Sequence, residues 1–202
     1  RYVNRWRLEC AQPVADGQLC EPKKPLIYYL DTNIPDQYRP YIMEGVNRWA
    51  RAFEQAGFRY AIRAEMLPAG ADAEDIRYPA LRWNVSTEPG YGAIGPSITD
   101  PRTGEILDAD IGIDVVRLRN ARNLRVEVIP SSPAADEAHA MACMAAEHAA
   151  QERGFALELL EARGAIAPDG HEAEQFVLED LKDLMMHEVG HTLGLRHNFR
   201  AS

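Results

Sequence analysis

The pattern of apolar and polar residues in the first third of the chain predicts a strand, a helix and a second strand. Residues 26–30 form a short, continuous apolar run, which is typical of a strand buried on both faces of a parallel sheet. Apolar side chains then recur at spacings of three and four up to Gly57, which predicts one helix with a core-facing stripe. The stripe consists of Ile42, Val46, Trp49, Phe53 and Ala56. Residues 58–64 alternate and predict the second strand, and this order of elements implies parallel pairing.

The middle of the chain predicts further strands and a tight hairpin. Alternation over residues 81–85 indicates a third strand, after a loop rich in Ala, Asp and Pro. Residues 94–99 can form a short strand, and residues 106–116 a longer one that returns beside it. The Asp-Pro-Arg-Thr-Gly sequence at 100–104 between them is a turn signal, because Pro presets φ and Gly takes a left-handed exit. We therefore expect an antiparallel edge strand on an otherwise parallel sheet.

The last third of the chain predicts helices. Residues 131–164 are rich in alanine and begin at a Ser-Pro start signal. A loop over 165–173 leads to a final helix at about 172–193, for which Asp169 is a candidate cap. The expected fold class is α/β, with a twisted, mixed and mostly parallel sheet of about five strands, an antiparallel edge strand and this final helix.

The final helix carries the residues with the clearest chemistry. His187 and His191 are four residues apart, so a helix presents both imidazoles on one face, where they can bind one zinc ion. Glu188 beside them is placed to act as a general base toward a water molecule. Gly194 suits the left-handed residue that ends a helix, and the reversal there brings His197 back as the third ligand. A fourth position left to water is typical of a catalytic zinc site.

Two other acidic features, a group of three aspartates and a single aspartate, each have two competing interpretations. Asp108, Asp110 and Asp114 share one face of the strand predicted at 106–116. Clustered carboxylates can bind Ca²⁺. Side chains on one face of a strand do not wrap around an ion, however, so a solvated or loop-bonding face is the better interpretation. Asp183 precedes His187 by four residues, so it is either a carboxylate that orients that imidazole or a solvated charge.

The string H-E-x-x-H-x-x-G-x-x-H at 187–197 resembles the zinc signature of the metzincin metallopeptidases. The longer runs HEVGHTLGLRHNFRAS, YYLDTNIPDQYRPYIMEGVNRWARAFEQAGF and DPRTGEILDADI resemble the large bacterial proteins called zinc-dependent metalloproteases. The resemblance implies the upper subdomain of a metzincin, one catalytic Zn²⁺ and a secreted, periplasmic or cell-surface location in a bacterium. A Met-containing turn beneath the zinc is a metzincin feature, and no Met follows His197 in this sequence.

The resemblance also implies how a peptide substrate binds. In metzincins the antiparallel edge strand pairs with the substrate as an added strand. The corresponding residues here are Ala93, Ile94, Gly95, Ser97 and Ile98. The alternative is an edge blunted by Pro96 that binds nothing.

Cysteine usage leaves two interpretations open. Cys10 and Cys20 can pair if the protein is exported. In some metzincins a Cys upstream of the domain caps the zinc, and either residue can be considered for that role.

Composition excludes several function classes. The net charge of −9 argues against a nucleic-acid surface, even though the first nine residues are basic and aromatic. The sequence contains no apolar run of 18 residues, so we expect no transmembrane helix. We expect residues 1–24 to be an arm from an upstream domain, and residues 25–202 a catalytic domain that continues beyond this sequence.

The predicted function is a zinc-dependent endopeptidase acting on peptides or proteins. The alternatives are an inactive or incomplete peptide-binding module derived from such an enzyme, and a zinc amidase acting on cell-wall peptides.

Overall fold

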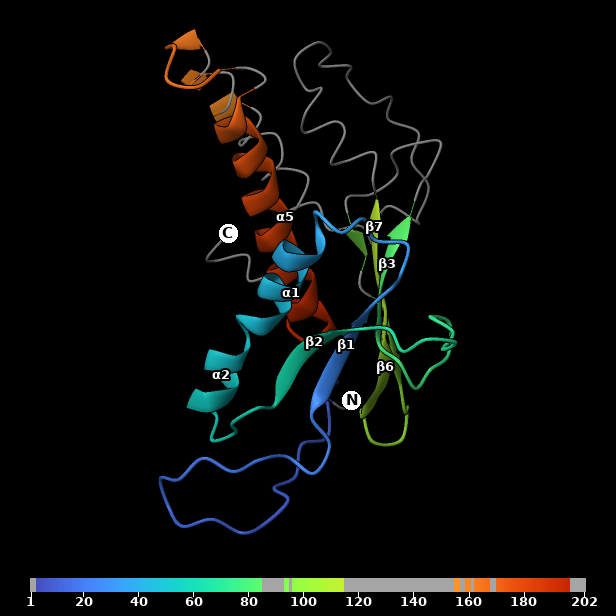
Figure 1. Cartoon of the computed structure of the whole chain (residues 1–202). Helices are drawn as coiled ribbons and strands as arrows, with labels where there is room; N and C mark the ends of the chain where they lie inside the picture. Colours follow the sequence, from blue (N-terminus) through green and yellow to red (C-terminus); the bar gives the residue numbers. More distant parts are fainter. Residues whose placement is uncertain are drawn as a thin grey trace.

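The computed structural model of the chain describes residues 3–84, 93–94, 96–114, 155–156, 159–160, 162–167 and 170–196. A sheet lies beside a long helix, α5, and the shorter helices α1 and α2 (Figure 1). Most of the helical region predicted at 131–164 lies outside the described residues, as does the candidate cap Asp169. Within the described part of the chain, no helix is long and apolar enough to cross a membrane.

The main sheet has five strands in the order β2-β1-β3-β7-β4. These strands are β1 (Leu26–Leu30), β2 (Ile62–Met66), β3 (Ala80–Asn84), β4 (Ala93–Ile94) and β7 (Ile111–Asp114). β1 pairs in parallel with both β2 and β3, and β3 pairs in parallel with β7. β4 is antiparallel to β7 at the edge. The predicted fold class, a mostly parallel sheet with an antiparallel edge strand, is confirmed.

The single helix predicted after β1 is wrong in one respect, because two helices occupy this segment. They are α1 (Arg39–Asn47) and α2 (Ala50–Gln55), separated by a turn at residues 48–49. The apolar spacing continues across the break, so the pattern alone does not reveal it. At the break, the Trp49 indole donates a hydrogen bond to the Met186 carbonyl of α5, 2.8 Å away.

The second predicted strand begins four residues later than expected. Tyr60 has a φ of +55° and a side chain that is 71% exposed, so residues 58–61 are not a regular strand. The alternation of Phe58 and Tyr60 with polar residues resembled a strand, but Phe58 makes only an isolated bridge to Cys20.

The predicted hairpin is present, but each of its strands is interrupted. β5 (Ser97–Thr99) pairs with β6 (Ile106–Ala109) as a separate two-stranded sheet, while β4 and β7 pair within the main sheet. The turn between β5 and β6 closes with the Gly104 N–H donating to the Asp100 carbonyl over 2.8 Å. The continuous strand predicted over 106–116 therefore divides at Asp110, and residues 115–116 lie outside the described part.

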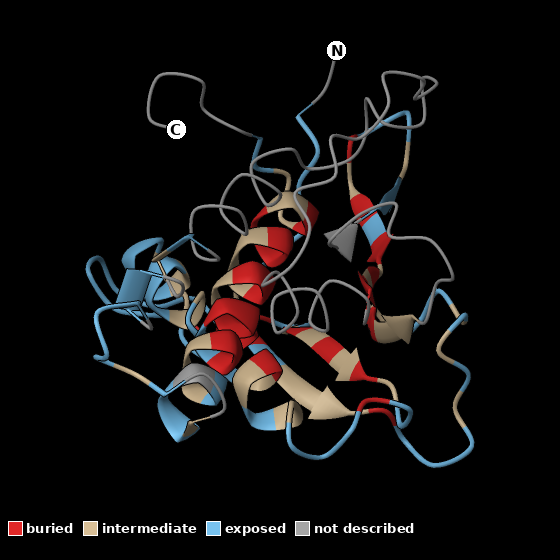
Figure 2. Ribbon diagram, turned by 90° about the horizontal axis from the view of Figure 1, so that it is seen from above, coloured by how far each residue is buried: buried red, intermediate tan, exposed pale blue. Residues whose placement is uncertain are grey.

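Helix α5 (His171–Thr192) packs against the sheet and α1 through one buried stripe. Figure 2 shows the buried positions running along this helix, the longest among the described residues. The stripe includes Val177, Leu181, Leu184, Met185 and Val189, and it meets Tyr28, Leu81 and Ile113 of the sheet. A Cβ on Gly45 of α1 would lie 2.6 Å from the Lys182 carbonyl oxygen, so glycine permits this close approach of the two helices.

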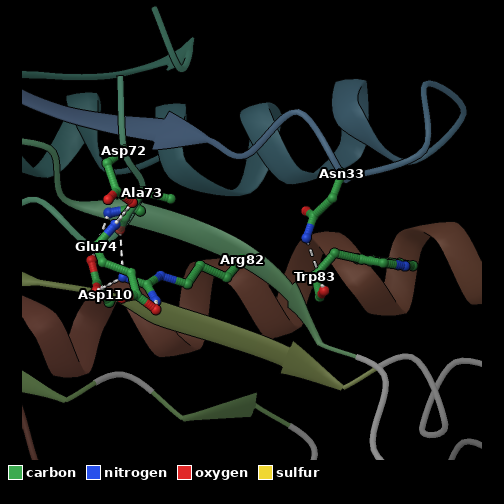
Figure 3. Close-up of polar contacts among 8 residues, drawn as sticks. Asn33, Asp72, Ala73, Glu74, Arg82, Trp83 and Asp110 are labelled. Atoms are coloured by element: carbon green, nitrogen blue, oxygen red, sulfur yellow. Dashed lines mark hydrogen bonds and ion pairs between the residues drawn. The ribbon is translucent and has the colours of Figure 1, made fainter. Parts of the chain in front are cut away.

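The predicted solvated face of aspartates on β6 and β7 is only partly correct. Asp108 and Asp114 are 6% and 0% exposed. Asp110 bonds β3, since its carboxylate accepts from the Ala80 N–H at 2.9 Å and from Arg82 at 2.8 Å. Figure 3 shows the Arg82 guanidinium between Asp110 and the loop residues Ala73 and Glu74.

The burial of Asp108 has a cost that depends on pH. Desolvation, with the neighbouring Asp110 carboxylate, raises the pKa of Asp108 from 3.8 to about 6. The folded state therefore retains a proton that the unfolded state has lost, and stability falls as pH rises from about 4 to 6. Asp108→Asn is expected to raise the free energy of unfolding at pH 8 by up to about 3 kcal/mol, and to change it little at pH 3.5. Urea unfolding of both proteins at the two pH values measures this difference.

A control with the opposite sign is available in the same hairpin. Hydrogen bonds from Arg102 lower the pKa of Asp100, so its charged form stabilises the fold above its unfolded pKa and that contribution is lost as pH falls. Asp100→Asn should therefore lower stability at pH 8. A destabilising effect of Asp108→Asn at pH 8 would contradict the assignment.

The N-terminal arm, residues 3–24, lies against the rest of the fold. Cys10 and Cys20 form a disulfide with a Cα–Cα distance of 5.6 Å, and Cys20 is buried. Trp6 and Leu8 pack against the hydrophobic core. The predicted division at residue 24 remains a prediction, but the arm contacts the domain that follows it.

Candidate metal centre at the end of α5

The last turns of α5 bring two of the predicted ligands together. His187 and His191 are four residues apart on the helix, and their Nε2 atoms lie 3.0 Å apart. Their rings are nearly perpendicular, with centroids separated by 4.6 Å. A tetrahedral zinc ion with Zn–N distances of roughly 2.0–2.1 Å places two ligand nitrogens about 3.3 Å apart. The two imidazoles therefore fit a shared ion with little movement.

The other nitrogen of the His191 ring fixes its tautomer. Nδ1 lies 3.0 Å from the carbonyl oxygen of Leu195, which can only accept a hydrogen bond. Nδ1 must therefore carry the proton, and in the neutral ring Nε2 keeps a lone pair directed toward His187. A histidine that binds a metal usually donates its second N–H to such a carbonyl or carboxylate.

Glu188 follows the first of these histidines and is 1% exposed. Burying a carboxylate costs free energy unless nearby charges or donors compensate it. A dication bound between the imidazoles would supply such compensation. The residue predicted as general base is thus a buried carboxyl group in the same turn of helix as the candidate ligands.

Gly194 ends the helix with a left-handed conformation. Its φ is +95°, its N–H donates to the His191 carbonyl at 2.9 Å, and the next N–H, of Leu195, donates to the Gly190 carbonyl at 3.0 Å. These two bonds form a Schellman motif. The chain reverses at the position where the sequence predicts a reversal. His197 lies outside the described residues, so its role as third ligand remains a prediction.

Aromatic side chains from three other segments hold this end of α5, and the sequence patterns did not assign them a role at the site. The Tyr28 hydroxyl lies 2.7 Å from Thr192 Oγ1, which itself donates to the Val189 carbonyl. Tyr28 is therefore the donor, and burial raises the pKa of Tyr28 so that the proton is retained. The Trp6 indole donates to the Thr192 carbonyl at 2.9 Å. The Trp49 indole donates to the Met186 carbonyl at the other end of this segment. Hydrogen bonds from other parts of the fold therefore flank the turns of α5 that carry both histidines.

The residues predicted to bind substrate occupy the edge hairpin. Ala93 and Ile94 form β4, the last strand of the sheet, which also contacts α5. Ser97 and Ile98 belong to β5, and the Ile98 side chain is 52% exposed. Gly95 lies outside the described residues.

Two other sequence predictions concern groups near the metal. The sulfur atoms of Cys10 and Cys20 are joined to each other, which removes the thiolate that capping a zinc ion would require. Asp183 is half exposed and lies 3.7 Å from Arg48, and its predicted role in orienting His187 remains a prediction. The described residues contain no group of three His, Cys, Asp or Glu side chains arranged around one point. The geometry therefore brings together two candidate ligands, and the predicted third, His197, lies outside the described residues.

The comparisons with known proteins bear on the same segment. A family model described as Met-zincin matches residues 169–202, which include α5 and the whole histidine motif. Comparison with curated proteins and with solved structures gives no match. The match shows a metzincin-like relationship for residues 169–202, whereas membership of the large bacterial group remains a prediction.

Proposed function

We propose, from the metzincin-like relationship of residues 169–202, that this chain belongs to a zinc-dependent endopeptidase. His187, His191 and His197 are the proposed ligands of one Zn²⁺, and Glu188 is the proposed general base. The relationship by itself indicates only a metallopeptidase type of family. The catalytic assignment is our inference from the residues.

One observation supports the proposal most directly. The Nε2 atoms of His187 and His191 converge to 3.0 Å, while Leu195 holds the proton of His191 on Nδ1. With the His191 proton on Nδ1, the free nitrogen of that ring is the one that faces His187 Nε2. Both features are expected of imidazoles that bind a metal through Nε2.

The chain's own residues account for the proton transfers of peptide hydrolysis. When bound, zinc supplies a Lewis acid that polarises the scissile carbonyl and lowers the pKa of water. The Glu188 carboxylate takes a proton from the attacking water as the new C–O bond forms. It then delivers that proton to the nitrogen of the leaving amine as the C–N bond breaks. Burial of Glu188 limits competing proton exchange with bulk water.

The edge hairpin is the proposed wall for an extended peptide. β4 lies at the edge of the sheet and contacts α5, which supports substrate pairing along Ala93, Ile94, Gly95, Ser97 and Ile98. An added strand would bring its backbone alongside the helix that carries the histidines. Pro96 removes one donor from this segment but leaves the carbonyl groups of its neighbours.

The proposed location is the periplasm, the cell surface or the outside of a bacterium. The Cys10–Cys20 disulfide supports an oxidising compartment, because disulfides are rare in reducing ones. Nucleic acid is not a proposed partner, given the net charge of −9.

Metal removal tests the proposed activity. The full-length protein containing these residues is incubated with casein, with and without a strong chelator, and its zinc content is measured by atomic absorption. We expect about one zinc per chain, cleavage in the absence of chelator, and loss of cleavage that added zinc reverses.

The same assay distinguishes the alternatives. Zinc without cleavage of casein, but with release of peptides from cell-wall fragments, would indicate the amidase. Peptide binding without any cleavage would indicate a non-catalytic module. Cleavage that resists the chelator in a zinc-free protein would contradict metal-dependent hydrolysis.

A further inference from the structure

The last turn of α5 needs hydrogen-bond donors for carbonyl groups that the helix itself cannot pair. Three of the final four carbonyls find donors within the turn. Val189 accepts from the Leu193 N–H at 2.9 Å, Gly190 from Leu195 at 3.0 Å, and His191 from Gly194 at 2.9 Å. The fourth carbonyl belongs to Thr192, and the chain has already reversed at Gly194. A donor for Thr192 must therefore come from another part of the fold.

Trp6 of the N-terminal arm is that donor. Its indole Nε1 lies 2.9 Å from the Thr192 carbonyl oxygen, across a sequence separation of 186 residues. The ring also packs against the hydrophobic core. This packing fixes the orientation of the ring, and with it the direction of the N–H toward Thr192. Thr192 follows His191 directly, which places this contact one residue from a proposed ligand.

The arm also lies against the reversal that leads toward His197. A Cβ built on Gly194 would lie 2.2 Å from the carbonyl oxygen of Asn4, so the backbones of the two residues are in close contact. The position of Asn4 thus constrains the direction in which the chain leaves α5. That direction sets the path of Leu195 and Arg196, the last described residues.

The opposite side of the arm is attached to the edge hairpin. The Arg5 N–H donates to the Gly104 carbonyl at 3.0 Å, and the Ile106 N–H donates to the Arg5 carbonyl at 2.9 Å. Arg5 therefore extends the pairing of β6 while its neighbours Asn4 and Trp6 contact the end of α5. Farther along, the Cys10–Cys20 disulfide closes a loop within the arm, and Cys20 forms a bridge to Phe58.

We infer that residues 4–6 are a positioning element of the metal centre, and that Trp6 is a positioning residue for His191. This inference rests on the proposed function. The arm contacts both α5, which carries the proposed ligands, and the hairpin proposed to bind the substrate. It therefore fixes the position of one relative to the other. Trp6 contacts neither metal nor substrate in this proposal, and it acts by fixing the turn on which the ligands stand.

The test is Trp6→Phe in the full-length protein, because phenylalanine keeps an aromatic ring and removes the N–H donor together with the volume of one ring. Trp83→Phe is the matched control, since the Trp83 ring stacks on Tyr38, 4.9 Å between centroids. The measurements are the Kd for Zn²⁺ by competition with a chromophoric chelator, the visible spectrum of the Co²⁺-substituted protein, and the thermal midpoint. We expect Trp6→Phe to weaken zinc binding by about 10- to 100-fold and to alter the Co²⁺ spectrum, as loss of a residue supporting a ligand does. We expect Trp83→Phe to leave both unchanged.

The outcomes separate this inference from the function on which it rests. If the unaltered protein binds zinc and Trp6→Phe has the same zinc Kd and Co²⁺ spectrum, the positioning role is overturned, whatever the thermal midpoint does. If Trp83→Phe weakens zinc binding equally, the effect is general destabilisation and the inference also fails. If the unaltered protein binds no zinc, the proposed function and this inference fall together.

Discussion

Replacing Glu188 with Gln is expected to reduce kcat for peptide cleavage by at least about 10²- to 10⁴-fold while one zinc ion stays bound. Glutamine has nearly the same shape, so the packing around a side chain that is 1% exposed is preserved. The amide cannot accept the proton of the attacking water. The two measurements are kcat on a fluorogenic peptide and zinc content, on the full-length protein.

Glu172→Gln is the control for that substitution. Glu172 is exposed in the first turn of α5, 16 residues before Glu188, which is about 24 Å along the helix axis. The same loss of a carboxylate there should leave kcat unchanged. Cleavage by Glu188→Gln at the rate of the unaltered protein would discard Glu188 as the base, and loss of zinc would instead indicate a role in metal binding.

The second large effect is expected from Gly194→Ala. A non-glycine residue at a φ of +95° is strained, which costs about 1–2 kcal/mol. The added Cβ would also meet the Asn4 carbonyl oxygen at 2.2 Å, a distance that requires the arm or the turn to move. We expect a total loss of about 3–5 kcal/mol in the free energy of unfolding, in the range of overpacking added to backbone strain. Urea unfolding measures it, and zinc affinity should fall as well.

Gly70→Ala separates the two causes of this loss. Gly70 has a φ of +80°, but a Cβ there meets nothing within 4 Å. Its substitution should therefore cost only the backbone strain and leave zinc affinity unchanged. Equal losses in the two variants would show that the contact between Gly194 and Asn4 contributes nothing.

Local patterns predicted the elements that position the site. The apolar run of β1 was placed at its observed bounds, and α5 was placed within one residue at each end, because apolar residues and histidines repeat along it with a helical period. The Asp-Pro-Arg-Thr-Gly turn indicated the edge hairpin because its residues favour the required backbone angles. These features depend on residues close together in the sequence.

The features that the sequence missed depend on contacts between distant residues. The break between α1 and α2 interrupts a continuous apolar stripe, and Trp49 there bonds Met186, 137 residues away. Trp6 looked like part of a linking arm, because nothing in its surroundings indicates that its acceptor is Thr192. Asp108 alternates with apolar residues as an exposed residue would, yet the fold covers it.

The bond between Trp6 and Thr192 has a consequence for the order of events during synthesis. A ribosome that adds about 5–20 residues per second exposes the indole roughly 10–40 s before its acceptor has been translated. Until then the nascent chain lacks the end of the ligand helix as well as the contact that steadies it. The proposed metal centre can therefore form only after the residues between Trp6 and Thr192 have all been translated.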